Sequence, residues 1–251
     1  SDLSPLSSDV AYRKIEQLVN EELGVPLAFG ALTQREGGTY NSSLFWLPNR
    51  GIVDIYDKKR PVPFAEYVPD RDFWYQLAPD LIGLITWDYS FGTADGIFEL
   101  GENRLGALIC FEIAIDDIGR ELVADEAELI LSQTNNADFG RTDESFQQAA
   151  LARLRAIETG RWVVQVAPTG FSAFVGPDGE VHSRTAVSER AVISQWAYLP
   201  WAQPITAKRQ MRAMGVPVVD RAAALTDPKL SELAYPSAPL RCQSHRRPNV
   251  L

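Results

Sequence analysis

The stretch Leu105-Gly-Ala-Leu-Ile-Cys-Phe-Glu112 decides how this chain folds. Its small and apolar residues are typical of a buried strand, and that strand ends on a cysteine. Residues 114–123 then have the apolar spacing of a helix, with two acidic residues in its first turn. A strand-to-helix turn can hold a nucleophile in a fixed position at the edge of a sheet. A cysteine in an apolar strand is, however, more often a small core residue, so this stretch alone favours the core interpretation of Cys110.

The composition is that of a globular protein. The 251 residues are 45% hydrophobic and 23% charged, which suits one large domain or two small ones. The net charge of −9 argues against nucleic-acid binding and against charge-driven docking on anionic lipid. Apolar runs stay shorter than the roughly 18–20 residues that span a bilayer. With two cysteines and two histidines, neither a disulfide framework nor a histidine-rich metal centre is expected, so we predict no metal and no cofactor.

Strands and helices interleave along the chain without a strict alternation. Strands are expected at 26–33, 40–46, 52–56, 97–100, 105–110, 128–132, 162–167, 171–175 and 191–196, and helices at 9–23, 114–123 and 144–159. This order indicates an α/β fold in which helix layers pack on sheets. From about residue 204 the chain becomes rich in basic residues and proline. We therefore predict one domain over residues 1–203 and an extended or partly disordered tail over 204–251.

Two ionisable residues follow the third expected strand. Lys58 comes directly after it, and a lysine at a strand end is normally solvated. Glu66 lies between Phe64 and Tyr67, where an unpaired carboxylate would be costly. We therefore expect Glu66 to have a partner, whereas Lys58 by itself indicates nothing more than a surface residue.

The segment over residues 71–91 contains many large apolar and aromatic groups for a region with little regular spacing. Trp74 and Trp87 are the largest of them. Apolar groups in such number need to be covered, either by their own domain or by a lipid-like ligand. The sequence supports a folded-back loop and a lid that contacts lipid about equally.

Four motifs occur in the chain in a fixed order. They are Tyr56-Asp-Lys58, Val62-Pro-Phe-Ala-Glu66-Tyr-Val-Pro69, Ile109-Cys-Phe-Glu112 and Thr134-Asn-Asn-Ala-Asp-Phe-Gly140. Together they resemble the carbon–nitrogen hydrolase (nitrilase) superfamily. Within it, the chain is most similar to the extracytoplasmic domain of the apolipoprotein N-acyltransferases, over about residues 1–199. Because the order and spacing of all the motifs agree, the resemblance reverses the preference for a core role of Cys110.

The resemblance implies a four-layer α-β-β-α sandwich of the nitrilase type and a Glu-Lys-Cys triad. By motif, Cys110 is the nucleophile that forms a thioester, and Lys58 stabilises the oxyanion. Glu66 and Glu112 match the supporting glutamates, which orient Lys58 and the pocket. The expected substrate contacts are Phe111, Asn135, Asp138, Trp74 and Trp87.

The chain departs from the family pattern in three places. The base glutamate of the family stands in a Trp-Pro-Glu segment, and this chain begins just after that segment, so we expect it to continue a longer polypeptide. Asp138 stands where the transferases usually have tryptophan, and Phe111 where many have tyrosine. The first change weakens lipid contact near the pocket, and the second removes only a hydroxyl. Residues after 199 do not resemble the return of the family to a membrane helix.

The leading hypothesis is an acyltransferase that moves an acyl chain from a phospholipid donor to the N-terminal diacylglyceryl-cysteine of a lipoprotein. It would work at the extracytoplasmic face of the cell membrane, attached through segments outside this chain, and without nucleic acid as a partner. The alternative is a soluble amidase- or nitrilase-like hydrolase, in which water takes the acyl group. A second alternative is a catalytically inactive relative, supported only by the missing base glutamate and by Asp138.

Overall fold

The computed structural model describes residues 9–137, 140 and 142–199. The tail predicted over 204–251 lies outside the described residues, as do Asp138 and Cys242. Among the described residues, every helix is too short or too polar to cross a bilayer.

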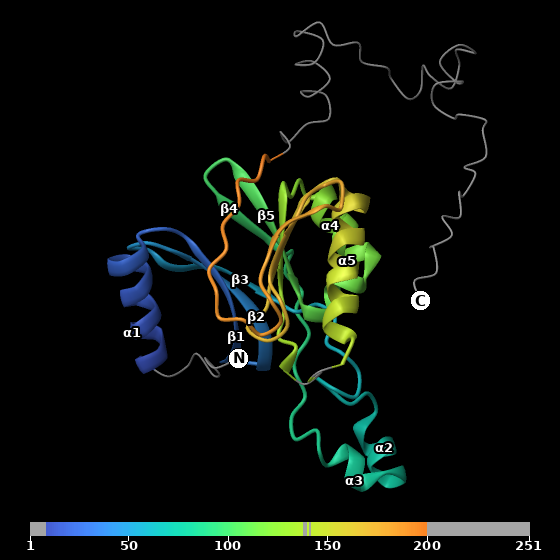
Figure 1. Ribbon diagram of the computed structural model, residues 1–251. Helices are drawn as coiled ribbons and strands as arrows, with labels where there is room; N and C mark the ends of the chain where they lie inside the picture. Colours follow the sequence, from blue (N-terminus) through green and yellow to red (C-terminus); the bar gives the residue numbers. More distant parts are fainter. Residues whose placement is uncertain (1–8, 138–139, 141, 200–251) are drawn as a thin grey trace, which may run out of the picture. The chain divides into compact units, whose positions relative to one another are not determined.

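Two sheets carry the fold (Figure 1). The first consists of β1 (Leu27–Arg35), β2 (Gly38–Leu47) and β3 (Gly51–Asp57), paired antiparallel in this order. The second has six strands in sequence order. They are β4 (Ile97–Leu100), β5 (Asn103–Ile109), β6 (Leu129–Gln133), β7 (Trp162–Val166), β8 (Ala173–Val175) and β9 (Val181–Arg184).

The centre of the second sheet is parallel, since β5 pairs with β6 and β6 with β7 in the same direction. Parallel neighbours need crossover connections, and α4 (Asp116–Ala124) and α5 (Glu144–Thr159) supply them. Both helices cover one face of this sheet (Figure 1). Their apolar sides bury a core of aliphatic residues that includes Leu108, Ile130 and Val163 from the three parallel strands.

Helix α1 (Asp9–Gln17) covers the first sheet, and its last turns continue as a π-helix over Leu18–Leu23. Ile15 and Val19 pack on Leu44 and Trp46 of β2. The helix ends at Gly24, whose φ of 64° suits glycine and whose N–H bonds back to Val19. The single helix predicted over 9–23 therefore has the expected extent, with a change of helix type in its second half.

The inner faces of the two sheets pack against each other through aromatic side chains. Phe45 of β2 stacks on Phe98 of β4 with ring centroids 5.2 Å apart, beside Tyr56 and Ile109. The order helix, sheet, sheet, helix confirms the predicted four-layer α-β-β-α sandwich (Figure 1).

Three segments differ from the sequence expectation. The short strand β9 forms where the sequence predicted none, and it pairs antiparallel with β8. The strand predicted over 191–196 does not form, because the described residues 185–199 pair with no strand and Val192 is 98% exposed. The segment expected to be irregular contains two short helices, α2 (Arg71–Leu77) and α3 (Pro79–Ile82). They stand away from the sandwich (Figure 1), and we call residues 71–88 the excursion.

Candidate active site

The candidate nucleophile Cys110 lies at the end of β5, where a single 3₁₀ turn over Cys110–Ala114 begins. Its φ is +54°, a left-handed conformation that residues other than glycine rarely adopt. The turn leaves Cys110 half-buried, exposes Phe111 and buries Glu112 completely. A strained turn at a strand end persists only if the surrounding structure stabilises it. Glu112 contributes to this stabilisation through the hydrogen bonds of its carboxylate.

The carboxylate of Glu112 ties the end of β3 to the nucleophile turn. It accepts hydrogen bonds from the backbone N–H of Ile109 at 2.9 Å, of Lys59 at 2.7 Å and of Arg60 at 3.1 Å. The Tyr56 hydroxyl donates to the same carboxylate at 3.0 and 3.1 Å. Since β3 belongs to the first sheet and Ile109 to the second, one buried side chain joins the two sheets beside Cys110.

The ionisation of Glu112 reflects two opposing influences. Burial raises the pKa of Glu112, while the backbone donors, the Tyr56 hydroxyl and the positive charge of Lys58 act to lower it. Burial and the neighbouring carboxylate of Glu112 together raise the pKa of Tyr56, so its hydroxyl remains a donor. The charge of Lys58 therefore acts on Glu112, the carboxylate that binds the backbone of the nucleophile turn.

Lys58 is buried, with 1% of its side chain exposed, and pairs with Glu66 at 2.6 Å between Nζ and Oε2. The partner expected for Glu66 is therefore present. Glu66 also accepts from the Val62 backbone N–H at 2.7 Å and from the Asn41 side chain at 3.0 Å. Burying a lysine is costly unless it is paired and hydrogen-bonded. Glu66 consequently fixes both the charge and the direction of the Lys58 side chain.

Behind Cys110 lies a polar cluster that sequence reasoning missed. The Gln148 amide on α5 points its Nε2 at Cys110 Sγ, 4.0 Å away. Its Oε1 lies 3.0 Å from the Thr134 hydroxyl, which also lies 3.0 Å from Asn136 Oδ1. Gln148, Thr134 and Asn136 are all buried. The signal in the sequence was a polar residue on the inner face of an amphipathic helix.

The residues predicted to contact substrate lie on different elements of the fold. Asn135 is exposed in the loop after β6, and its Oδ1 accepts from the Ala137 N–H at 3.1 Å. Trp74 lies on α2 and Trp87 follows α3, so both belong to the excursion rather than to the turn of Cys110. Their roles, and that of Phe111, stay predictions.

The excursion nevertheless starts and ends beside the Lys58–Glu66 pair. Where the chain returns from the excursion, the Tyr89 N–H donates to the Glu66 carbonyl at 2.7 Å, and the Gly92 N–H donates to the Lys58 carbonyl at 2.9 Å. A Cβ on Gly92 would lie 2.0 Å from the Asp57 carbonyl oxygen, so this close approach requires glycine. Residues 71–88 are thus carried by the same backbone that positions the candidate lysine.

Comparison with known proteins identifies the family of the chain. Residues 10–195 match the family model described as carbon-nitrogen hydrolase. The chain belongs to the carbon-nitrogen hydrolase family. The match confirms the family that the four motifs predict.

Relatives of the chain include apolipoprotein N-acyltransferases. The one from Mycolicibacterium smegmatis is 33% identical over 193 residues, which cover 74% of this chain and 32% of the relative. The one from Nostoc sp. is 36% identical over 159 residues, covering 63% of this chain and 31% of the relative. The chain thus spans about a third of the length of these relatives.

A solved amidase from Nesterenkonia sp. AN1 has a similar fold, with a TM-score of 0.57 at 18% identity. The superposition covers 82% of this chain and 75% of the amidase. At this identity the likeness concerns the fold alone, and it supports the four-layer architecture of the chain.

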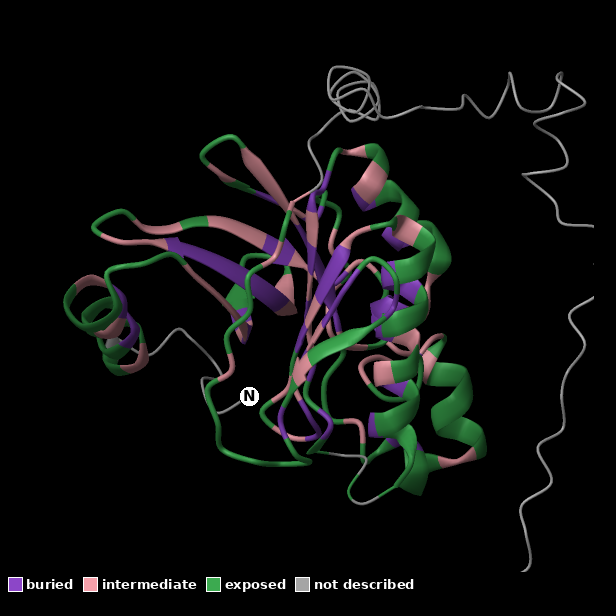
Figure 2. Cartoon of the chain, turned by 45° about the horizontal axis from the view of Figure 1, so that its top comes forward, coloured by how far each residue is buried: buried purple, intermediate pink, exposed green. Residues whose placement is uncertain are grey.

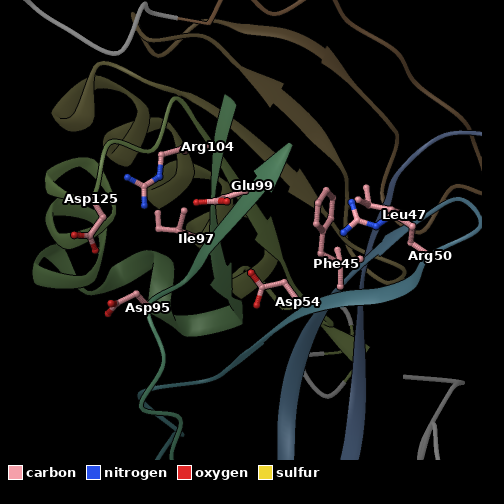
Figure 3. A pocket seen from close by; sticks show the side chains of 10 residues that line it. Phe45, Leu47, Arg50, Asp54, Asp95, Ile97, Glu99, Arg104 and Asp125 are labelled. Atoms are coloured by element: carbon pink, nitrogen blue, oxygen red, sulfur yellow. The ribbon is translucent and has the colours of Figure 1, made fainter. Parts of the chain in front are cut away.

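Two further features of the chain do not include the residues around Cys110. A cavity of about 390 Å³ lies between β2–β3 and β4–β5, and Figure 3 shows side chains that line it. Its lining residues are Phe45, Leu47, Arg50, Val53, Asp54, Asp95, Ile97, Glu99, Arg104 and Asp125. None of the predicted catalytic residues is among them.

The second feature is a group of potential metal ligands where β8 turns into β9. The ligand atoms of Asp178, Glu180 and His182 lie within 4.8 Å of one another, and all three residues are exposed. No predicted site residue belongs to this group, so we assign it no part in the candidate active site.

Proposed function

We propose that this chain is the acyl-transfer domain of an apolipoprotein N-acyltransferase-like enzyme. One observation carries the proposal: Glu112 joins the turn of Cys110 to the strand end that holds the buried Lys58–Glu66 pair. A nucleophile on a strained turn, linked to a fixed buried cation, suits attack on an acyl carbonyl. The similarity to the N-acyltransferases supplies the substrate class.

In the first half of the proposed reaction, the Cys110 thiolate attacks the ester carbonyl of a phospholipid. A carbon–sulfur bond forms, the ester carbon–oxygen bond breaks, and a lysophospholipid leaves as an alcohol after protonation. Lys58 donates to the oxygen that becomes negative, because Glu66 takes one of its three N–H groups and fixes its direction. The family resemblance assigns the proton transfers to the base glutamate of the family's Trp-Pro-Glu segment.

In the second half, the α-amino group of a lipoprotein N-terminal cysteine attacks the thioester. A carbon–nitrogen bond forms, the carbon–sulfur bond breaks, and the thiolate of Cys110 is regenerated. A thioester suits this exchange because a thiolate is both a good nucleophile and a good leaving group. In this proposal the domain works at the extracytoplasmic membrane surface, where donor and acceptor meet.

The excursion supports a lipid substrate. Its two helices are almost entirely exposed (Figure 2). The large exposed side chains of the excursion are Phe73, Trp74, Tyr75, Leu77, Leu81, Leu84 and Trp87. An apolar surface of this kind, carried on the backbone next to Lys58, suits contact with acyl chains at a membrane surface.

The test is to identify the adduct. The chain, alone and within any longer polypeptide that its gene encodes, is incubated with phosphatidylethanolamine vesicles and analysed by peptide mass spectrometry. We expect an acyl thioester on the Cys110 peptide and none on the Cys242 peptide. Release of ammonia from small amides, with no adduct from phospholipid, would replace the transferase with the hydrolase. Absence of both activities in the longer polypeptide would favour the inactive relative.

A further inference from the structure

In the polar cluster behind Cys110, the hydroxyl of Thr134 has two possible acceptors. The Thr134 hydroxyl lies 3.0 Å from two amide oxygens, those of Gln148 and Asn136. A hydroxyl has a single hydrogen, so it can donate to only one of them. Asn136 Nδ2 is meanwhile buried without a hydrogen-bond partner among the described residues.

Turning the Asn136 amide by 180° gives Nδ2 a partner and frees the Thr134 hydrogen, since the two ends of an amide are nearly equal in shape. Oδ1 then takes the buried position that Nδ2 held. Asn136 Nδ2 then donates to Thr134 Oγ1, and the Thr134 hydrogen is free for Gln148 Oε1. All bonds of the cluster now run in one direction, from Asn136 through Thr134 to Gln148. The last donor in this direction is Gln148 Nε2, which faces Cys110 Sγ at 4.0 Å.

The position of Gln148 is fixed from a second direction. Two turns further along α5, the buried Arg155 donates to the Ile113 carbonyl at 3.2 and 3.3 Å and to Asp116 at 2.8 Å. These bonds hold α5 against the turn that begins at Cys110. Gln148 is itself only 6% exposed, so its amide has little room to turn away from the sulfur.

We propose that Gln148 is a positioning residue whose amide N–H holds the sulfur of Cys110 and stabilises its thiolate by a hydrogen bond. The inference rests on the proposed role of Cys110 as the nucleophile, and it adds a donor on α5 that the sequence motifs do not include. A hydrogen bond to the charged form of an acid favours that form, so more of the cysteine is reactive at neutral pH.

The reversed arrangement makes the opposite prediction. If Thr134 donates to Asn136, a turned Gln148 donates to Thr134 and presents its oxygen to the sulfur. That oxygen would accept from the thiol S–H and would stabilise the uncharged form. The pH dependence of thiol reactivity therefore distinguishes the two arrangements.

The experiment measures the alkylation of Cys110 by iodoacetamide as a function of pH. The full chain carries Cys242→Ser, so that only Cys110 reacts. In Gln148→Met, which keeps the length of the side chain, we expect the rate at pH 7 to fall about tenfold and the midpoint of the pH profile to move to higher pH. Gln148→Glu should move the midpoint further, because a carboxylate beside the sulfur opposes the thiolate.

The matched control is Gln147→Met, the exposed neighbour on the same helix, which should leave the profile unchanged. The charged groups around the turn, namely Lys58, Glu66, Glu112 and Arg155, stay in place in every variant. Thr134→Val removes the hydroxyl that orients Gln148, and it should shift the midpoint in the same direction by a smaller amount. If circular dichroism shows that Gln148→Met does not fold, the midpoint measured in Thr134→Val tests the proposal instead.

An unchanged midpoint in Gln148→Met, or a midpoint at lower pH, would overturn the proposal, as would an equal shift in Gln147→Met. Alkylation requires neither phospholipid nor lipoprotein. A shifted profile in a protein that never forms an acyl thioester would therefore overturn the proposed function and leave the role of Gln148 intact.

Discussion

At the scale of single residues, the site depends on where charge is held. Lys58→Met keeps most of the side-chain stem but removes the ammonium next to Glu66. Loss of one oxyanion donor typically slows turnover by roughly a hundred- to a thousandfold. We therefore expect acyl-enzyme formation to slow by that factor, as measured by mass spectrometry. Lys59→Met is the matched control, because the Lys59 side chain pairs with Asp95 and Glu121 instead. An unchanged rate in Lys58→Met would remove Lys58 from the mechanism.

The sequence predicts these residues unequally. Glu66 stands out locally, because a carboxylate among aromatic residues needs a partner. Cys110 alone has the surroundings of a core residue, and it became a candidate nucleophile only through the resemblance that the four motifs carry. Gln148 could not be found in this way, because its contact joins residues 38 positions apart and depends on how α5 docks. The four donors around Glu112 were equally invisible, since three of them are backbone N–H groups that carry no sequence signal.

At the scale of elements, the excursion is the part whose role the sequence left open. Replacing Trp74 and Trp87 with serine should remove roughly 1.5–3 kcal/mol of transfer free energy per ring, if the rings contact lipid. Acylation from phospholipid vesicles should then fall steeply, while acylation by a short soluble thioester and the melting temperature should change little. Trp196→Ser is the matched control, since Trp196 is 88% exposed outside the excursion. A joint loss of both activities with a lower melting temperature would identify the rings as structural.

The base of the excursion should respond to acid. Arg71 donates to Asp88 at 2.6 and 2.9 Å, and these hydrogen bonds lower the pKa of the Asp88 carboxyl. A carboxyl whose pKa is lower in the folded state stabilises the fold above its ordinary value of about 4, and this stabilisation is lost as the pH falls through the lowered pKa. Cleavage of residues 71–88 by pepsin should therefore increase over that range.

Asp88→Asn should loosen the excursion already at neutral pH, measured as faster hydrogen exchange over residues 71–88. Asp80→Asn, an exposed substitution on α3, is the control and should have little effect. Equal exchange in both variants would show that the Arg71–Asp88 pair does not hold the excursion.

The strands show which elements a sequence pattern can predict and which it cannot. Most strands lie at nearly the expected residues, because alternation and turn residues mark them, whereas the short strand β9 was not predicted. Residues 191–196 have a strand-like composition, but within the described part of the chain they pair with no strand. A strand is a property of a pair, so composition alone predicted one where none forms.

At the scale of the whole molecule, the site exists because two sheets with different connectivity meet. Lys58 follows the last strand of the first sheet, and Cys110 ends a central strand of the second. The family resemblance predicted this sandwich correctly, whereas alternation alone indicated only helices packed on sheets. The aromatic contact between Phe45 and Phe98 holds the sheets together, and Glu112 joins them at the site.

The site therefore depends on the contact between the two sheets. Phe98 is fully buried between the sheets, so Phe98→Ala should lower the free energy of unfolding by about 3–5 kcal/mol, through lost burial and the cavity left behind. Because both sheets share this layer, urea unfolding followed by circular dichroism and by Trp fluorescence should still give one coincident transition at a lower midpoint. Phe73→Ala, an exposed ring on α2, should leave the midpoint almost unchanged. Two separate transitions in Phe98→Ala would mean that each sheet is stable without the other, and that Glu112 rather than the shared core brings Lys58 to Cys110.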